Sequence, residues 1–241
     1  MGLAVGSDAA AVRDADRVYE DLRQRILSLD LIPGSIFDEA RIVSELGVSR
    51  TPVREAVIRL VSEGLLRRDG RQIRVSSFEV GQLRPFFEAN RLLSRSLHRM
   101  AAIRRTPAQL EKIRTEMLAF EKSVREGTDV IMNEANYRFH REIARAADSA
   151  FLERTYSDIL LEAMRLSRQC FEAGDNTVDQ LEAHIARIVA DHRDLFTAIE
   201  QREPDAADNV AARHSDLFKD RVARQLLGPP NTRGTLDLAD L

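Results

Sequence analysis

Apolar positions in the first part of the chain follow helical patterns. From Asp14 they recur at every third or fourth residue, which predicts one buried helix face made of Val18, Leu22, Ile26 and Leu29. The breakers Ile32-Pro33-Gly34 are expected to end that helix. Asp38 is a good N-cap for a second, short helix, whose inner face we expect at Ile42, Val43 and Leu46.

A third helical pattern follows a tight turn at Gly47-Val48 and ends at Gly64. Thr51 and Pro52 are predicted as its N-cap and first helical residue, because a proline loses no hydrogen bond there. One face of this helix is apolar and consists of Val53, Ala56, Val57, Leu60 and Val61. The opposite face is polar and carries Arg50, Thr51, Arg54 and Arg59. Two faces alone are common in surface helices, so the flanking segments decide what this helix does.

The segment after Gly64 predicts a β-hairpin. Residues 65–67 and 73–75 read as two short strands, and Asp69-Gly70 between them is a strong turn signal. Three helices followed by a hairpin predict a winged helix-turn-helix over residues 13–77. Residues 1–12 are small and unpatterned, and we expect them to form a mobile N-terminal tail.

From residue 78 to residue 227 only helical periodicity occurs. It is interrupted at residues 105–107, 127–128, 148–149, 173–175 and 203–204, which leaves helices of about 18–28 residues. Long helices with short connections predict an all-α antiparallel bundle of six or seven helices. The chain is thus expected to be mainly α, and residues 228–241, which begin Gly228-Pro229-Pro230, are expected to form a flexible C-terminal tail.

Composition limits the setting of the protein. No apolar run approaches the length of a membrane helix, and the first residues lack the basic and apolar parts of a signal peptide. Cys170 is the only cysteine, which excludes an internal disulfide. We therefore expect a cytoplasmic protein without a membrane partner.

Charge is unevenly distributed along the chain. Residues 41–75 contain eight arginines against four acidic residues, so their net charge is +4, whereas residues 77–241 have a net charge of −3. A basic segment on an acidic remainder is typical of a nucleic-acid reader attached to a separate module.

The third helix has the side chains that a helix in the DNA major groove requires. Arg50, Thr51 and Arg54 lie at its N-terminal end, where contacts to bases and phosphates occur, with apolar anchorage on the other face. The hairpin tip, with Gly70 and Arg71, is expected to reach the adjacent minor groove. Arg59 lies farther along and is either a backbone contact or solvated. The alternative is a plain three-helix domain with an arginine-rich solvated face.

Histidines suggest a second site in the bundle. Asn136 and His140 are four residues apart and share a helix face, while His192 and His214 fall on two later helices. If they converge, three imidazoles and an amide oxygen would bind a divalent transition metal. The alternative is that each histidine is a surface group or a hydrogen-bonded core group. His98 and His184 are expected to be solvated.

The segment from Gly47 to Ala56, GVSRTPVREA, resembles the DNA-binding domain of GntR-type bacterial transcription regulators, and the similarity extends from about Val18 to Phe78. The resemblance implies that Ser49, Arg50, Thr51 and Arg54 contact the operator and that Gly70 lies in the wing. A homodimer on a short, near-palindromic operator is expected as well, because one helix in one groove discriminates weakly and paired half-sites double the readout. Ala40 occupies a position where such regulators usually have arginine, and the neighbouring Arg41 is a candidate substitute.

Three later segments, NYRFHREIARAADSAFL, DHRDLFTAIEQREPDAA and ARHSDLF, are similar to the FCD effector-binding domain of the FadR branch of these regulators. In that domain an Asp and three His hold a metal beside a cavity for a small organic acid. The resemblance places His140, His192 and His214 in this metal site, with Asn136 at the Asp position, for a divalent ion of the Zn, Ni or Mn class. It also implies that Arg91 faces the effector, while Arg95 stands where glutamate is usual.

Two classes of function remain from the sequence. The first is a ligand-responsive DNA-binding transcription regulator, acting as a repressor, whose bundle binds a small organic acid. The second is a metal-dependent enzyme with the bundle as its catalytic domain, since a histidine site with an open position can activate water. No paired carboxylates or nucleophile and base accompany the histidines in the sequence, and an enzyme leaves the basic winged helix unexplained.

Overall fold

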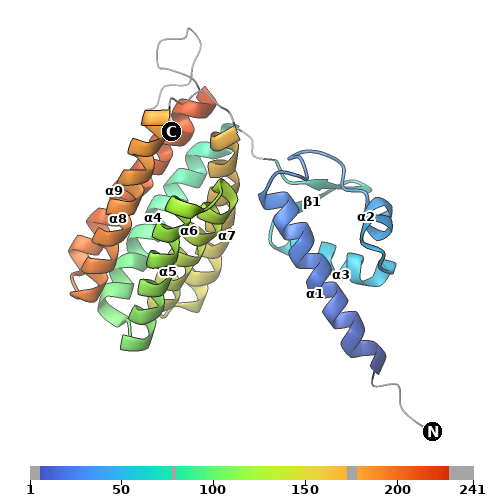
Figure 1. Cartoon of the computed structure of the whole chain (residues 1–241), viewed down its shortest axis with the longest axis horizontal. Helices are drawn as coiled ribbons and strands as arrows, with labels where there is room; N and C mark the ends of the chain where they lie inside the picture. The colour runs from blue at the N-terminus through green and yellow to red at the C-terminus, as the bar shows by residue number, and fades with distance from the viewer. Residues whose placement is uncertain (1–5, 78–79, 173–177, 228–241) are drawn as a thin grey trace. The chain divides into compact units, whose positions relative to one another are not determined.

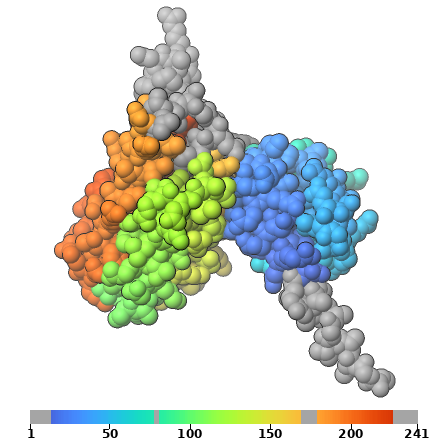
Figure 2. Space-filling model, in the orientation of Figure 1, coloured from blue at the N-terminus to red at the C-terminus, as the bar shows by residue number. Residues whose placement is uncertain are grey.

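The computed structural model describes residues 6–77, 80–172 and 178–227, whose elements fall into two units that divide after residue 78 (Figure 1). The first unit contains helices and a two-stranded hairpin, and the second is entirely helical in its described residues. The prediction of a mainly α chain with a winged helix-turn-helix before a helical bundle is confirmed. Figure 2 shows the surfaces of the two units, the first in blue and the second from green to red.

The core of the first unit lies between α1 (Gly6–Leu27) and α3 (Arg50–Ser62). Their facing apolar side chains are buried, among them Val18, Leu22 and Ile26 from α1 and Val53, Val57 and Leu60 from α3. Helix α1 begins at Gly6, so it includes residues 6–12, which the sequence pattern assigned to the mobile N-terminal tail. Their alanine-rich sequence favours a helix although it has no apolar periodicity.

The turn before α3 is fixed by two local features. Asp38 caps α2 (Glu39–Leu46), because its Oδ1 accepts hydrogen bonds from the backbone N–H groups of Ala40 and Arg41 at 2.9 and 3.2 Å. Gly47 then ends α2 in the left-handed conformation, with φ of 62°. This conformation costs a residue with a side chain about 1–2 kcal/mol, so glycine allows the chain to turn directly into α3.

Helix α3 begins one residue earlier than its sequence predicted. Its N-cap is Ser49, in an extended conformation, and Arg50 is already helical, so the prediction of Thr51 as the cap is wrong. Pro52 is therefore the third helical residue. The first four N–H groups of a helix have no partner within it, so proline still removes no hydrogen bond at this place.

The hairpin consists of β1 (Leu66–Asp69) and β2 (Gln72–Val75), which pair antiparallel with Leu66 opposite Val75 and Asp69 opposite Gln72. Gly70 has φ of 59° in the turn. Arg74 on β2 donates to the carboxylate of Asp69 beside the turn at 2.9 Å and to the Gly34 carbonyl at 3.0 Å. The wing is thus tied to the loop after α1.

Arg59 has a structural partner that neither alternative from the sequence anticipated. Its guanidinium carbon lies 3.8 Å from the centroid of the Tyr19 ring, and its Nη1 lies 2.6 Å from Asp16. The Tyr19 hydroxyl in turn donates to Glu63 just beyond α3, at 2.8 and 2.9 Å to its two oxygens. Burial, together with this hydrogen bond, raises the pKa of Tyr19 to about 12. Arg59 therefore joins α3 to α1.

The second unit contains a short 3₁₀ turn, η1 (Val80–Gln82), and six described helices, in agreement with the predicted bundle. These are α4 (Leu83–Arg104), α5 (Pro107–Glu126), α6 (Asp129–Ala146), α7 (Ala150–Glu172), α8 (Val178–Glu200) and α9 (Pro204–Leu227). Thr106 starts α5 with a reciprocal capping box formed with Gln109, and Thr128 caps α6. The break predicted at residues 173–175 lies outside the described residues.

The helices of the second unit bury a continuous interior. α4 packs mainly on α9, and α5 on α6, while α6, α7 and α8 close the remaining sides (Figure 1). The interior contains large apolar side chains such as Leu97, Phe139 and Ile143, but also several polar ones. None of the described helices combines the length and apolar character that crossing a membrane requires.

Leu60 and Ile58 on α3 give a direct test of this core. Leu60 is 0% exposed, whereas Ile58 is 60% exposed. We expect Leu60→Ala to lower the free energy of unfolding of the first unit by about 2–5 kcal/mol, because it removes contacts and forms a cavity. Ile58→Ala should change the free energy of unfolding by less than about 0.5 kcal/mol. Hydrogen exchange of the α1 amides measures the effect, and similar protection in the two variants would contradict the packing described.

Candidate functional site

Three histidines from three helices meet inside the second unit: His140 on α6, His192 on α8 and His214 on α9. Their ring centroids lie 5.0–5.1 Å apart in each pair. One ring nitrogen from each can be chosen so that all three lie within 4.8 Å of one another. The structure thus brings together the three residues that sequence reasoning selected for a metal site.

His192 is the most enclosed member of this histidine triad. It is 0% exposed and packs against Phe120 and Phe139, with ring centroids 4.5 and 4.4 Å away. Both of its ring nitrogens are buried without a hydrogen-bond partner among the described residues. A buried polar atom without a partner costs about 1–3 kcal/mol. A metal ion bound by one of these nitrogens would remove part of that cost.

Burial favours the uncharged form of two members of the triad. It lowers the pKa of His140 and His192 well below the usual 6.5, and the neighbouring imidazoles contribute in the same direction. A neutral imidazole has one nitrogen with a free lone pair, which is the form that binds metals. The donor set therefore fits a divalent transition metal.

His214 has an acidic partner on its outer side. Its Nδ1 lies 3.3 Å from Oδ2 of Asp191, a buried carboxylate that also accepts a hydrogen bond from Arg213. Burial alone would raise the pKa of Asp191, but the hydrogen bonds from His214 and Arg213 outweigh it and the pKa is lowered. A carboxylate behind a metal-binding histidine fixes the tautomer that leaves Nε2 free for the ion.

Two histidines expected to be solvated are not. His98 on α4 is 0% exposed and lies behind His140, with ring centroids 5.6 Å apart. His184 on α8 is partly buried, and burial, followed by the charge of Arg221, lowers its pKa to about 4. The prediction failed because a helix pattern does not show which polar positions face the centre of a bundle with helices on every side.

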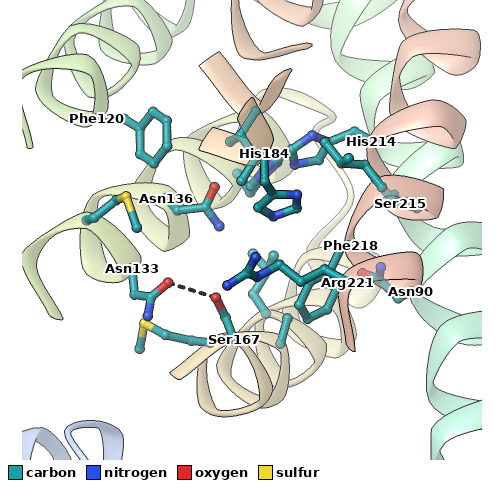
Figure 3. A pocket seen from close by; sticks show the side chains of 18 of the residues that line it. Asn90, Phe120, Asn133, Asn136, Ser167, His184, His214, Ser215, Phe218 and Arg221 are labelled. Atoms are coloured by element: carbon teal, nitrogen blue, oxygen red, sulfur yellow. Dashed lines mark hydrogen bonds between the residues drawn. The ribbon is translucent and has the colours of Figure 1, made fainter. Parts of the chain in front are cut away.

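A cavity of about 80 Å³ adjoins the triad (Figure 3). All six helices of the unit contribute to its wall, which includes His140 and His214. The wall has an apolar part around Phe120, Met132, Leu160 and Phe218 and a polar part of amides, hydroxyls and cations. The polar part includes Asn90, Asn133, Asn136, Ser167, His184, Ser215 and Arg221. Ser167 donates to the Asn133 amide oxygen at 3.0 Å.

Arg221 provides the permanent positive charge of this cavity. It is 7% exposed, and its guanidinium extends into the cavity near His184 and Ser167 (Figure 3). No aspartate or glutamate is among the described residues of the wall. Sequence reasoning missed Arg221, although it lies seven residues after His214 and therefore on the same side of α9.

Other arginines of the second unit, among them the predicted Arg91, lie outside the described cavity wall and pair with acidic residues. Arg91 is exposed on α4 and pairs with Asp216 at 3.0 Å, and it does not line the cavity. Arg95 pairs with Asp208 at 2.7 Å, and Arg138 pairs with Glu116 at 2.9 Å. Arg145 pairs with Glu142. Asn136, by contrast, lies on the cavity wall on the same helix as His140 (Figure 3).

The first unit presents its predicted DNA-reading side chains to solvent. Arg50, Thr51 and Arg54 are exposed at the N-terminal end of α3, and the exposed Ser49 makes no side-chain capping hydrogen bond. In the wing, Gly70 and Arg71 are exposed as well. Arg41 is exposed on α2 and pairs with Glu45 at 2.6 Å.

One further arginine lies beside this surface. Arg68 on β1 lines a shallow hollow with Arg54 of α3 and Glu39 of α2. The Arg54 Nε atom and the Glu39 Oε2 atom are 3.9 Å apart, which is too long for a hydrogen bond, so this ion pair is weak. The hollow is thus lined by arginines from two different elements, which the sequence pattern did not indicate.

Comparison with known families divides the chain in the same order as the two units. Residues 14–75 match the model for bacterial regulatory proteins of the gntR family, and residues 86–217 match the model for the FCD domain. The two matches contain all of the exposed side chains predicted to read DNA and the whole histidine triad.

Individual proteins agree with these matches. A probable D-xylose utilization operon transcriptional repressor from Paenarthrobacter nicotinovorans is 26% identical over 93% of this chain and 92% of its own. A putative L-lactate dehydrogenase operon regulatory protein from Escherichia coli is 33% identical over 65% of this chain and 69% of its own. The solved structure of E. coli McbR/YncC has a TM-score of 0.73 at 20% identity, covering 88% of this chain and 98% of that one, which shows a shared fold.

Proposed function

The chain belongs to the gntR family of bacterial regulatory proteins and carries an FCD domain, and from this premise we propose that it is a repressor controlled by a small organic acid. It is a DNA-binding transcription regulator with an effector-binding domain. The family consists of regulators, so the metal-dependent enzyme considered from the sequence is not retained.

The observation that supports an acidic effector is the charge of the cavity wall. Arg221 contributes a buried positive charge, and no carboxylate is present among the described wall residues. Charges interact more strongly in a poorly hydrated interior than in water. An anion entering this cavity would therefore gain attraction from Arg221 and hydrogen bonds from nearby amides and hydroxyls.

The size of the cavity favours a small acid. One water molecule needs roughly 10–15 Å³ of such space, so a cavity of about 80 Å³ corresponds to a ligand of roughly five to eight non-hydrogen atoms. One relative is named for an L-lactate dehydrogenase operon, and lactate is within this size range. We therefore place short hydroxy, keto and dicarboxylic acids first among candidate effectors.

The effector is proposed to act beside a divalent metal of the Zn, Ni or Mn class. His140, His192 and His214 would hold the ion, and the Asn136 amide oxygen would replace the usual carboxylate. The bound ion would act as a Lewis acid that attracts a carboxylate. Because Asn136 is neutral, this site would bind a metal ion more weakly than a site with aspartate. The positive charge of a bound ion would also be less compensated by its ligands.

DNA is proposed to be read by the N-terminal end of α3. Ser49, Arg50, Thr51 and Arg54 would contact bases and phosphates in the major groove, as a helix in this position does. The wing, with Gly70 and Arg71, would reach the minor groove, and Arg41 would contact the backbone. A homodimer would bind two half-sites of a near-palindromic operator and so double the readout.

Effector and DNA would be linked through the relative population of two arrangements of the dimer. An acid in the cavity can change operator affinity only by as much as it binds one arrangement better than the other. We propose that the acid favours the arrangement with lower operator affinity, so that its presence relieves repression.

The DNA proposal predicts that Arg50→Ala combined with Arg54→Ala weakens operator binding by about a hundredfold or more, because each base contact of this kind is worth about 1–3 kcal/mol. Fluorescence anisotropy with promoter DNA from upstream of the protein's own gene measures this. The control is Arg84→Ala, which removes an exposed arginine that pairs with Glu88 on α4. Unchanged sequence-specific binding by the double variant would refute the proposed reading surface.

The metal proposal predicts opposite effects of two substitutions. His192→Ala should abolish the metal content of protein purified without chelator, because it removes a ligand. Asn136→Asp should increase affinity for Zn²⁺ by adding a negative charge. His184→Ala is the control, since His184 lines the cavity outside the triad and should leave metal content unchanged. Elemental analysis decides, and equally negligible metal in wild type and His192→Ala would remove the metal from the proposal.

The effector proposal predicts that at least one short carboxylic acid raises the melting temperature of the wild type. At a hundred times its dissociation constant a ligand stabilises the folded protein by about 2.7 kcal/mol. Arg221→Met should lose most of this stabilisation, whereas Arg91→Met should keep it, because Arg91 pairs with Asp216 at the surface. Loss in Arg91→Met with retention in Arg221→Met would reverse the assignment.

A further inference from the structure

A fourth imidazole, His98, is buried behind the histidine triad and does not belong to it. It lies on α4, 0% exposed, and is not among the residues whose nitrogens converge. It does not line the cavity either. Both of its ring nitrogens nevertheless lie close to a polar atom. A histidine that contributed only packing would not need these two contacts.

The first contact fixes the hydrogen of His98. Its Nδ1 lies 2.5 Å from the backbone carbonyl oxygen of Ser94, one turn earlier on the same helix. A carbonyl oxygen can only accept, so Nδ1 must carry the hydrogen. Full burial disfavours a second proton on the ring. Nε2 of His98 is then the nitrogen with the lone pair.

The second contact makes the tautomer of His140 depend on the tautomer of His98. Nε2 of His98 faces Nδ1 of His140 at 3.4 Å, and the two rings are inclined by 65°. Two lone pairs at this separation would repel each other, so Nδ1 of His140 must donate. The lone pair of His140 is therefore on Nε2, and its ring cannot use Nδ1 to bind an ion.

Together these contacts form a directed chain from the Ser94 carbonyl through His98 to His140. We propose that His98 is a positioning residue of the metal site, which holds His140 in the Nδ1–H tautomer so that Nε2 is available to a metal. The inference rests on the proposed metal site. It adds a residue outside the ligand set to which no role had been assigned.

The structure contains a second arrangement of this type for comparison. Asp191 stands behind His214 in the same way as His98 stands behind His140, with its carboxylate 3.3 Å from Nδ1. Two of the three triad members thus have an outer partner that selects the same tautomer. The partner of His140 is neutral, so it orients the ring without adding negative charge to a site that already has Asn136 in place of aspartate.

The tautomer can be measured directly in wild-type protein without metal. Long-range ¹H–¹⁵N NMR correlations of ¹⁵N-histidine-labelled protein distinguish a ring protonated at Nδ1 from one protonated at Nε2. We expect both His98 and His140 to be protonated at Nδ1. A hydrogen on Nε2 of His140 in the wild type would overturn the inference, and no variant needs to fold for this outcome to be seen.

Two substitutions then separate positioning from packing. His98→Leu keeps the apolar volume but cannot accept a hydrogen bond, so His140 should revert at least partly to the Nε2–H form. His98→Gln can accept from His140 through its amide oxygen and donate to Ser94 through its amide nitrogen, so the Nδ1–H form should persist. Identical His140 tautomers in the two variants would refute the positioning role.

Zinc affinity, measured by competition with a chromogenic chelator, gives an independent readout. We expect His98→Leu to weaken Zn²⁺ binding by about 10–100-fold, as loss of an outer partner does at other metal sites, and His98→Gln to stay near the wild type. If the wild type binds zinc and His98→Leu binds it equally well, only the role of His98 fails. If the wild type binds no zinc, the proposed metal site fails and this role with it.

Discussion

His192 is enclosed by two phenylalanine rings, and its two nitrogens are left without partners by the described residues. An apolar side chain would suit such surroundings better, so a histidine there is a cost that the rest of the bundle must tolerate. Other polar side chains surround His192: His140 and His214 lie next to it on two other helices, His98 lies behind His140, and Asp191 lies behind His214. The bundle has a polar centre inside an apolar shell, and the cavity opens beside it.

The second unit keeps acidic side chains off the described wall of the cavity, although Asp191 lies behind His214. Its sequence is acidic overall, yet no acidic residue is among the described residues of the cavity wall. Many of its carboxylates instead pair with arginines at the surface, as Asp216 does with Arg91 and Asp208 does with Arg95. Such exposed pairs contribute little to stability. Their more important effect is electrostatic, because they keep these carboxylates off the cavity wall, on which Arg221 lies.

The sequence pattern predicted the order of elements, the resemblance to the FCD domain implied the convergence of the triad, and neither indicated the composition of the cavity. Breakers such as Pro107 and Gly127 and the apolar stripes mark the helices locally, so those predictions needed no tertiary information. The roles of Arg59, His98 and Arg221 depend on contacts between residues far apart in the chain, or on which helix face points inward. Arg91 and Arg221 have the same chemistry in the sequence, and only the packing of α4 and α9 places one outside and the other inside.

The contact between Arg59 and Tyr19 has a mechanical consequence. Tyr19 is held at once by the guanidinium of Arg59 within α3 and by Glu63 just beyond its end. Rotation of α3 about its own axis would have to break both contacts, so α1 and α3 turn together as a single rigid body. The angle at which arginines are presented to a groove is therefore set partly by α1. In the proposed complex with DNA, adjustment to a variant operator would then fall to the DNA and to the hairpin tip at Gly70, which has open space around it.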